Sequence, residues 1–197
     1  MTSQDKSQQA LQRIRADVRA MQAYHVQDSK GLLKMDTMEN PYRLPDALQQ
    51  KLGERLGALE INRYPGERLE TLKKMLADYV GAPTGTAVLL GNGSDEIITL
   101  LALATAQPHA EGRAKMLAPM PGFVMYPMSA QLQGLDFVGV NLTADFDLDV
   151  PAMQAAIAAH KPAITYIAYP NNPTATLWDQ DKVQAVIDAV ADVGGLV

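Results

Sequence analysis

From residue 86 to its last residue, the chain alternates between short apolar runs and longer segments whose apolar side chains have helical spacing. Short apolar runs bounded by turn residues predict buried strands, and apolar side chains three or four residues apart predict helices. Such alternation favours an α/β fold, a largely parallel sheet with helices on both faces. The predicted strands are 86–90, 114–118, 135–140, 163–168 and a beginning at 195–197; the predicted helices are 94–106, 125–133, 150–160 and 179–193.

The residues before this alternating part predict an N-terminal arm that is mainly helical. One helix is expected from about Leu11 to Ala23, and a second is opened by Pro45 and stops near Gly57. A third, amphipathic helix carries the apolar residues of 69–79 and ends near Gly81. At the other end, residues 194–197 read as the entry to a buried strand, so we expect the chain to be part of a longer protein.

Charge and composition exclude several classes of function. Asp and Glu number 22 and Lys and Arg 17, and a net charge of −5 argues against a nucleic-acid or membrane-surface partner. The absence of cysteine excludes disulfides and thiolate metal ligands, and His25, His109 and His160 show no metal-ligand spacing. No stretch approaches the roughly 20 apolar residues of a membrane span, and no secretion signal is recognisable. We therefore expect a soluble, cytoplasmic protein without a metal site.

The segment Gly91–Glu96 joins a predicted strand to a predicted helix through two glycines. A helix start presents unpaired backbone N–H groups and the positive end of the helix dipole, and glycine lets a ligand approach the backbone closely. The junction therefore suits a phosphate group, and Ser94 adds a hydroxyl there. The alternative is an ordinary turn, in which Asp95 and Glu96 simply complement the helix dipole.

Two further loops follow predicted strands and should lie at the same edge of the sheet, where ligands of such folds bind. Pro119–Tyr126 supplies aromatic rings at Phe123 and Tyr126, and Tyr169–Thr174 supplies the side-chain amides of its two asparagines. A flat, phosphorylated heteroaromatic ligand would use backbone donors, a stacking ring and an amide together. Separately, the rings could belong to the core and the asparagines could cap a turn.

Five motifs in this order resemble those of the fold-type I pyridoxal-phosphate aminotransferases. They are Glu39-Asn40-Pro41, Arg63-Tyr64-Pro65, Gly91-Asn92-Gly93-Ser94-Asp95-Glu96, Pro121-Gly122-Phe123-Val124-Met125-Tyr126 and Tyr169-Pro170-Asn171-Asn172-Pro173-Thr174. Within that family, the sequence is most similar to the histidinol-phosphate aminotransferases. The resemblance runs from about residue 30 to the last residue.

The resemblance implies a role for each matching position. Backbone amides of Gly93, Ser94 and Asp95 would hold the phosphate of pyridoxal 5'-phosphate, and Phe123 would stack on its pyridine ring. Asn172 would bond the phenolic oxygen of the cofactor, and Tyr64 would reach the phosphate bound by the partner of a homodimer. Residues 1–60 would form the N-terminal arm and part of the small domain, and residues 61–197 part of the cofactor-binding large domain.

Some positions depart from the family pattern. The family usually has Asn at Met38, a glycine near Arg43, a Thr-Tyr or similar pair at Gly122-Phe123, and Gly at Ala175. The Schiff-base lysine, the acid under the pyridine nitrogen and a substrate-binding arginine are expected beyond Val197. The lysines Lys115, Lys161 and Lys182 are expected to be surface residues. No catalytic residue is therefore assigned within the chain.

The implied reaction of the whole protein is transamination between a small amino donor and a 2-oxo acid, most specifically histidinol phosphate with 2-oxoglutarate in histidine biosynthesis. Residues 1–197 alone are expected to be inactive. Alternatives on the same scaffold are an aminotransferase for aromatic or other amino acids and a phospho-amino-acid decarboxylase. A non-catalytic ligand-binding domain is a further alternative. An unrelated nucleotide-binding domain is disfavoured because the Gly91 turn lacks the G-x-G-x-x-G spacing.

Overall fold

The computed structural model describes residues 10–22, 28–34, 39–107 and 112–197. The chain forms two compact units, which are considered separately below. Unit 1 comprises the N-terminal residues up to Met21 together with Gly91–Val197, and unit 2 comprises Gln22–Leu90. The predicted arm and large domain were divided at residue 60 instead, and that assignment stays a prediction about the whole protein.

Unit 1 contains the parallel sheet that the alternating pattern predicts. Its strands are β1 (Lys115–Met120), β2 (Asp136–Asn141) and β3 (Ile164–Thr165), in the order β2-β1-β3. All pairs are parallel, with Lys115 opposite Asp136 and Met116 opposite Ile164. The central strand is β1, whose four middle residues are all buried. The α/β fold class is therefore confirmed.

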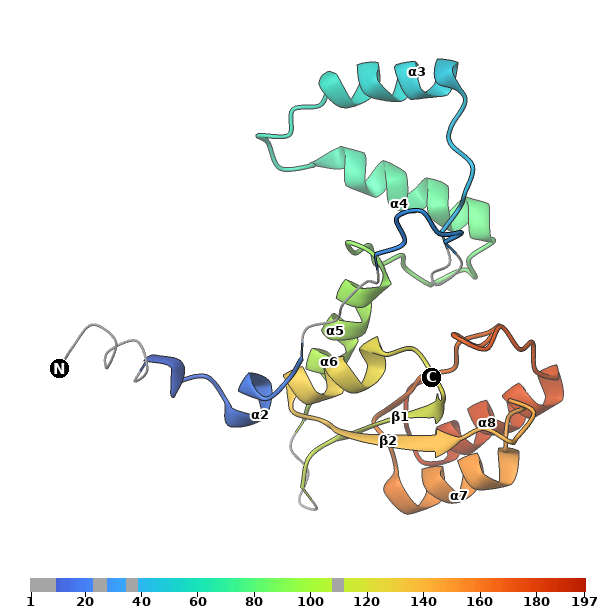
Figure 1. The fold of residues 1–197 in the computed structure, drawn as a ribbon. Helices are drawn as coiled ribbons and strands as arrows, with labels where there is room; N and C mark the ends of the chain where they lie inside the picture. Colours follow the sequence, from blue (N-terminus) through green and yellow to red (C-terminus); the bar gives the residue numbers. More distant parts are fainter. Residues whose placement is uncertain (1–9, 23–27, 35–38, 108–111) are drawn as a thin grey trace. The chain divides into compact units, whose positions relative to one another are not determined.

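Helices cover both faces of this sheet (Figure 1). On one face lie α5 (Ser94–Thr105) and α6 (Met125–Gln133), and on the other lie α7 (Val150–His160) and α8 (Gln180–Asp192). Successive side chains of a strand point to opposite faces. Met116 and Ala118 accordingly join the core under α5 and α6, whereas Leu117 joins the core under α7 and α8. The near-continuous apolar strand is thus explained by two covered faces.

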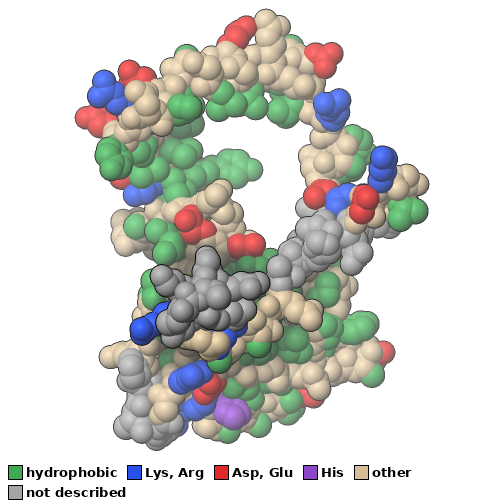
Figure 2. Space-filling view, turned by 60° about the vertical axis from the view of Figure 1, so that its left-hand side comes forward, with side chains coloured by type: hydrophobic (Ala, Val, Ile, Leu, Met, Phe, Trp, Pro, Cys, Tyr) green, Lys and Arg blue, Asp and Glu red, His purple; other side chains and the backbone are tan. Residues whose placement is uncertain are grey.

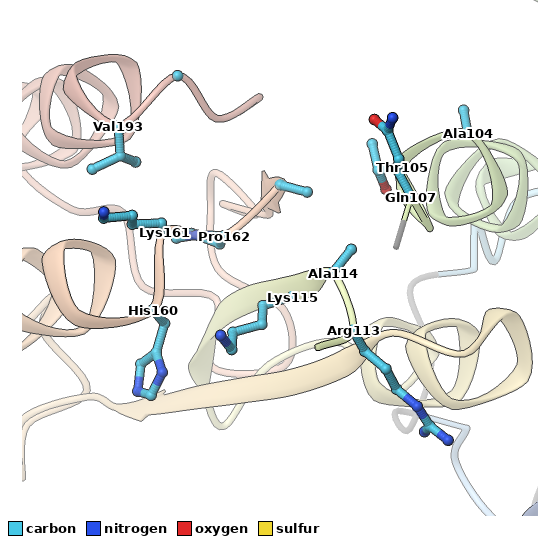
Figure 3. Close-up of a pocket in the computed structure, with 12 residues that line it drawn as sticks. Ala104, Thr105, Gln107, Arg113, Ala114, Lys115, His160, Lys161, Pro162 and Val193 are labelled. Atoms are coloured by element: carbon cyan, nitrogen blue, oxygen red, sulfur yellow. The ribbon is translucent and has the colours of Figure 1, made fainter. Parts of the chain in front are cut away.

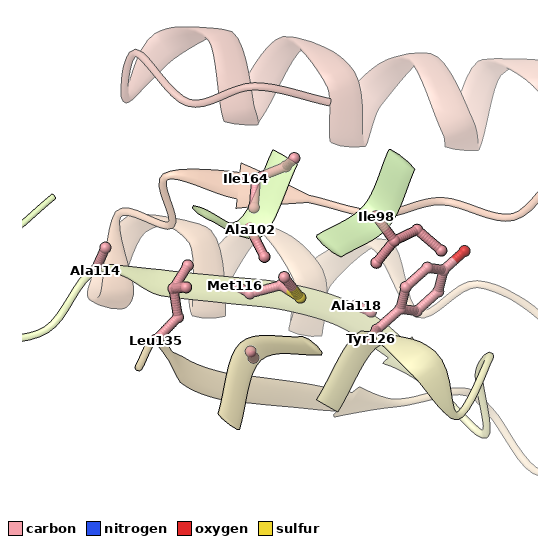
Figure 4. Close-up of a cluster of buried hydrophobic side chains, with 9 residues drawn as sticks. Ile98, Ala102, Ala114, Met116, Ala118, Tyr126, Leu135 and Ile164 are labelled. Atoms are coloured by element: carbon pink, nitrogen blue, oxygen red, sulfur yellow. The ribbon is translucent and has the colours of Figure 1, made fainter. Parts of the chain in front are cut away.

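The two cores differ in the size of the side chains that fill the space between sheet and helices. Under α5 and α6, Ala102 and Ala130 are fully buried, and such small residues let the helix backbones approach the sheet (Figure 4). Under α7 and α8, larger side chains fill the space, namely Met153, Ile157, Trp178, Val186 and Val190. The Trp178 indole N–H donates to the Phe146 carbonyl at 3.0 Å, so the one buried indole donor is satisfied.

The prediction of a strand at 86–90 is wrong, because these residues form no strand. A strand requires a neighbour to receive its backbone hydrogen bonds, and none of the described residues pairs with this run. One residue of this run, Leu89, is 63% exposed. The strand predicted at 163–168 is present but shorter, and the beginning predicted at 195–197 is a single parallel bridge between Ile164 and Leu196.

The helix predicted from Leu11 to Ala23 is interrupted from Gln12 to Arg15, and its last residue lies outside the described residues. Arg15 has an extended backbone, and α2 (Ala16–Arg19) begins directly after it. The Arg15 guanidinium donates to the carbonyls of Gln131 and Leu132 at 2.7 and 2.9 Å. These contacts hold the interrupted segment to the last turn of α6.

Unit 2 contains the two predicted amphipathic helices, α3 (Asp46–Gly57) and α4 (Glu67–Val80). Both predictions are confirmed, and Gly81 closes α4 with the left-handed backbone (φ 63°) that favours glycine. No described residue of unit 2 is buried. Apolar side chains stand exposed along both helices (Figure 2), among them Leu48, Leu52, Leu56, Leu72, Met75 and Tyr79.

Candidate functional site

The start of α5 presents uncapped backbone donors. Its N-cap is Gly93, whose φ of 82° lies in the left-handed region, and no side chain caps the helix. The N–H groups of the first turn have no partner within a helix, so those of Ser94 and Asp95 are available to an anion. Ser94 and Asp95 are both exposed. The first turn of α5 therefore has exposed, uncapped donors, and phosphate binding by them stays a prediction.

One of the two acids beside these donors is turned towards the loop. The Glu96 carboxylate accepts a hydrogen bond from the backbone N–H of Asn92, two residues before the helix. This bond holds the loop against the first turn, as reciprocal bonds at helix starts do. Glu96 thus has a structural role that is compatible with an anion on the backbone of the next residues.

The start of α5 lies at the carboxyl edge of the sheet, meaning the edge at which its parallel strands end. Ile98, in the second turn of α5, lies at the same end of the core as Ala118 and Tyr126 (Figure 4). Thr105, at the other end of α5, lines a cavity with Lys115, the first residue of β1. The helix therefore runs opposite to β1, which brings Gly93–Asp95 to the edge where ligands of such folds bind.

Phe123 lies in the loop between β1 and α6 at this edge. It is partly buried and packs against the core of α5 and α6. Its ring meets that of Tyr126 edge to face, with centroids 5.6 Å apart and planes at 87°. The adjoining Gly122 is required because a Cβ there would lie 2.4 Å from the Pro119 carbonyl oxygen. Of the two rings singled out in the sequence, Tyr126 belongs to the core and is 8% exposed.

The two neighbouring asparagines after β3 have different surroundings. Asn171 is buried, and its amide donates to the Pro121 carbonyl at 3.2 Å and to the Thr174 hydroxyl at 2.8 Å. It therefore ties the loop after β3 to the loop that carries Phe123. Asn172 is half-buried, and its side chain has no hydrogen-bond partner within the described residues. The predicted ligand amide is thus free, and sequence reasoning missed the adjacent residue that positions it.

Two tyrosine hydroxyls near this edge are held neutral by burial. Burial raises the pKa of Tyr126, and burial together with the nearby Tyr126 raises the pKa of Tyr166 to about 12. The Tyr166 hydroxyl is buried without a hydrogen-bond partner among the residues that the structure describes. Tyr166 stacks on Tyr126, with ring centroids 4.5 Å apart and planes at 13°. Both groups remain protonated donors at neutral pH.

Tyr64 lies in unit 2, in the turn between α3 and α4, and is 99% exposed. The structure therefore gathers Gly93, Ser94, Asp95, Phe123 and Asn172 in unit 1 and leaves Tyr64 in the other unit. Its ring is free to contact another chain, as the predicted role requires. Met38, His25 and His109 lie outside the described residues.

A cavity of about 580 Å³ lies at the opposite edge of the sheet, where β1 and β3 begin (Figure 3). Its lining includes Lys115, His160 and Lys161, and Arg113 extends away from them. His160 and Lys161 lie at the end of α7, where the Lys161 cation stabilises the negative end of the helix dipole. Lys182, the third lysine expected at the surface, pairs with Asp147 and lowers the pKa of that carboxyl. Lys115 and Lys161 therefore lie at the edge opposite to the start of α5, and Lys182, in the first turn of α8, is held by Asp147.

No helix in the part of the chain described by the structure has both the length and the apolar character that crossing a membrane demands.

The sequence was compared with known protein families and with curated proteins. The sequence model of the family described as aminotransferase class I and II matches residues 30–197. A histidinol-phosphate aminotransferase of Paracidovorax citrulli is 70% identical over 188 residues, which are 95% of this chain and 51% of that protein. The enzyme of the same name from Acidovorax sp. (strain JS42) is 65% identical over the whole chain and 52% of its own length. The chain thus spans about half the length of the curated relatives it matches.

Solved structures support the fold. The histidinol-phosphate aminotransferase of Clostridium acetobutylicum superposes with a TM-score of 0.66 at 22% identity, covering 82% of this chain and 45% of that one. A protein from Erwinia carotovora atroseptica, described as a putative histidinol-phosphate aminotransferase, gives 0.68 at 23% identity, covering 89% and 48%. Because the matching family model extends over most of the sequence, the chain belongs to the aminotransferase class I and II family.

Proposed function

We propose that the protein is a pyridoxal-phosphate-dependent aminotransferase that transfers an amino group between histidinol phosphate and 2-oxoglutarate in histidine biosynthesis. The observation that carries the choice of substrate is the 70% identity, over 95% of the chain, to a protein named histidinol-phosphate aminotransferase. Solved neighbours of the same fold include one from Sinorhizobium meliloti described as a complex with pyridoxal-5'-phosphate. The substrate is proposed for the whole protein, of which this chain spans about half the length of its relatives.

The residues at the carboxyl edge fit this cofactor. The uncapped N–H groups of Ser94 and Asp95 would hold its phosphate, and the left-handed Gly93 keeps the approach open. Phe123 would stack on its ring, and the free amide of Asn172 would donate to its phenolic oxygen. When bound, the cofactor supplies an electron sink for carbon–hydrogen bond cleavage. The chain would orient the flat ring between the Phe123 side chain and the Asn172 amide.

Among the described residues of unit 1, no unpaired lysine lies at this edge to bond the cofactor covalently. Lys115 and Lys161 line the opposite edge, and Lys182 is paired with Asp147. The proton transfer and covalent attachment of this family therefore need residues outside this set. Residues 1–197 alone are expected to show no turnover.

The function is tested with the full-length protein. We expect glutamate to form from histidinol phosphate and 2-oxoglutarate, with much slower turnover for aromatic amino donors. Asn172→Ala should weaken cofactor binding roughly ten- to a hundredfold, because hydrogen bonds to charged groups contribute about 1.5–3 kcal/mol. Gln154→Ala, an exposed amide on α7, is the matched control and should leave binding unchanged. Absence of glutamate formation, or a preference for another donor, would contradict the assignment of substrate.

We also propose that the protein acts as a homodimer in which Tyr64 donates to the cofactor phosphate held by the partner. The full exposure of Tyr64 supports a contact outside its own chain. In the full-length protein, Tyr64→Phe should speed cofactor loss during dialysis while the dimer persists in gel filtration. Tyr79→Phe, the same change at an exposed tyrosine of α4, is the matched control and should leave retention unchanged. A monomeric wild-type protein, or equal cofactor retention by Tyr64→Phe, would count against this arrangement.

A further inference from the structure

Three aromatic rings form a continuous row at the carboxyl edge of the sheet. Phe123 meets Tyr126 edge to face at 5.6 Å, and Tyr126 stacks on Tyr166 at 4.5 Å. The rings come from three separate segments: the loop after β1, the first turn of α6 and the residue that follows β3. Tyr126 is the middle ring, and it alone touches both others.

Tyr126 is also the most firmly held of the three. Its side chain is 8% exposed, whereas Phe123 and Tyr166 are only partly buried. It belongs to the core that contains Ile98 of α5 and Ala118 of β1 (Figure 4). The start of α5 carries the uncapped donors, and the residue after Tyr166 leads to the loop of Asn172. The middle ring therefore contacts Phe123 directly and shares a core with Ile98, in the second turn of α5.

An edge-to-face contact restricts the plane of a ring, because the positive edge of one ring is attracted by the negative face of the other. Phe123 has no polar atom that could fix its orientation by a hydrogen bond. We propose that Tyr126 is a positioning residue, whose ring sets the plane of Phe123 against the flat ligand at this edge. This inference rests on the proposed cofactor site and adds a residue that touches neither cofactor nor substrate.

The ring of Tyr126, rather than its hydroxyl, performs this role. No described residue forms a hydrogen bond with the hydroxyl, and the contacts to Phe123 and Tyr166 are both ring contacts. Tyr126→Phe keeps both contacts, and Tyr126→Leu removes both. The two variants thus separate positioning by the ring from any effect of the hydroxyl.

The test uses full-length protein loaded with pyridoxal phosphate. The readouts are the cofactor dissociation constant, the circular dichroism of the bound cofactor, which reports its orientation, and the melting temperature. Tyr126→Leu should weaken cofactor binding about two- to tenfold, the range set by one aromatic contact, and should change the dichroism. Tyr126→Phe should match the wild type in both.

A matched control separates an effect on cofactor orientation from a general loss of stability. Met153→Ala removes a side chain of comparable burial from the other core, under α7 and α8, and should lower the melting temperature without altering the dichroism. If Tyr126→Leu behaves like Met153→Ala, the inference is overturned. If Tyr126→Leu does not fold, Tyr166→Leu is used in its place, because loss of the stacked Tyr166 ring lets Tyr126 tilt. Unchanged dichroism in Tyr166→Leu then overturns the inference. A wild-type protein that binds no cofactor instead refutes the proposed function.

Discussion

At the scale of single residues, Ala175 stands where the family usually has glycine. Its backbone conformation is one that favours glycine. Its φ is 57°, in the left-handed region that costs a residue with a Cβ about 1–2 kcal/mol. Its N–H donates to the Asn171 carbonyl at 2.8 Å, which closes the turn that carries both asparagines. Ala175→Gly should therefore stabilise the full-length protein by about 0.5–1 kcal/mol, after the entropic cost of glycine in the unfolded chain. Urea denaturation measures this.

The control for Ala175→Gly is the same substitution in a regular helix. Ala155 lies on the exposed side of α7, and Ala155→Gly should destabilise the protein by about 1 kcal/mol because glycine disfavours helix interiors. The two variants are expected to shift the urea midpoint in opposite directions. Destabilisation by both would show that Ala175 is not strained.

The two asparagines show what the sequence could predict about the site. The motif position of Asn172 predicts a ligand contact, and the structure has this residue half-buried in the loop after β3. The sequence missed Asn171, whose amide bonds Pro121, a residue 50 positions away in the chain. Neighbouring residues of the same type give no local signal about which one is buried. Only the contact between the two loops distinguishes Asn171, which ties the loops together, from Asn172, whose amide has no partner among the described residues.

At the scale of elements, local signals decided which boundaries could be predicted. Asp149 accepts from the Ala152 N–H at 3.0 Å and Asp179 from the Asp181 N–H at 2.8 Å, so α7 and α8 begin within a residue or two of their predicted starts. Each of these caps is a contact between near neighbours in the sequence. Patterns that depend on such contacts can be read without the fold.

Elements that depend on distant partners were predicted less well. Residues 86–90 have the composition of a strand but no neighbouring strand among the described residues, and the interrupted segment at Arg15 is held by carbonyls more than 100 residues away. Likewise, β3 extends only as far as its pairing with β1 and Leu196. Strand propensity describes a residue's fit to a pleated surface, and the partner that completes the surface is a property of the whole fold.

At the scale of the whole molecule, the two units differ in how their helices are supported. Unit 1 has two cores, on either face of its sheet, whereas no described residue of unit 2 is buried. Exposed apolar surface of the kind along α3 and α4 marks a contact in most soluble proteins. The chain spans about half the length of its curated relatives, and in the homodimer proposed above these helices would be covered by another part of the assembly.

This difference predicts the pattern of amide hydrogen exchange. In residues 1–197 alone, the amides of α3 should exchange close to the rate of an unfolded chain, because an isolated helix of about 12–15 residues is marginal in water. The matched control is α7, of 11 residues, whose Met153 and Ile157 are buried and whose amides should be strongly protected. In the full-length protein, α3 should gain protection and α7 should change little. Equal protection of the two helices in residues 1–197 would mean that α3 is packed without the rest of the protein, contrary to its exposure.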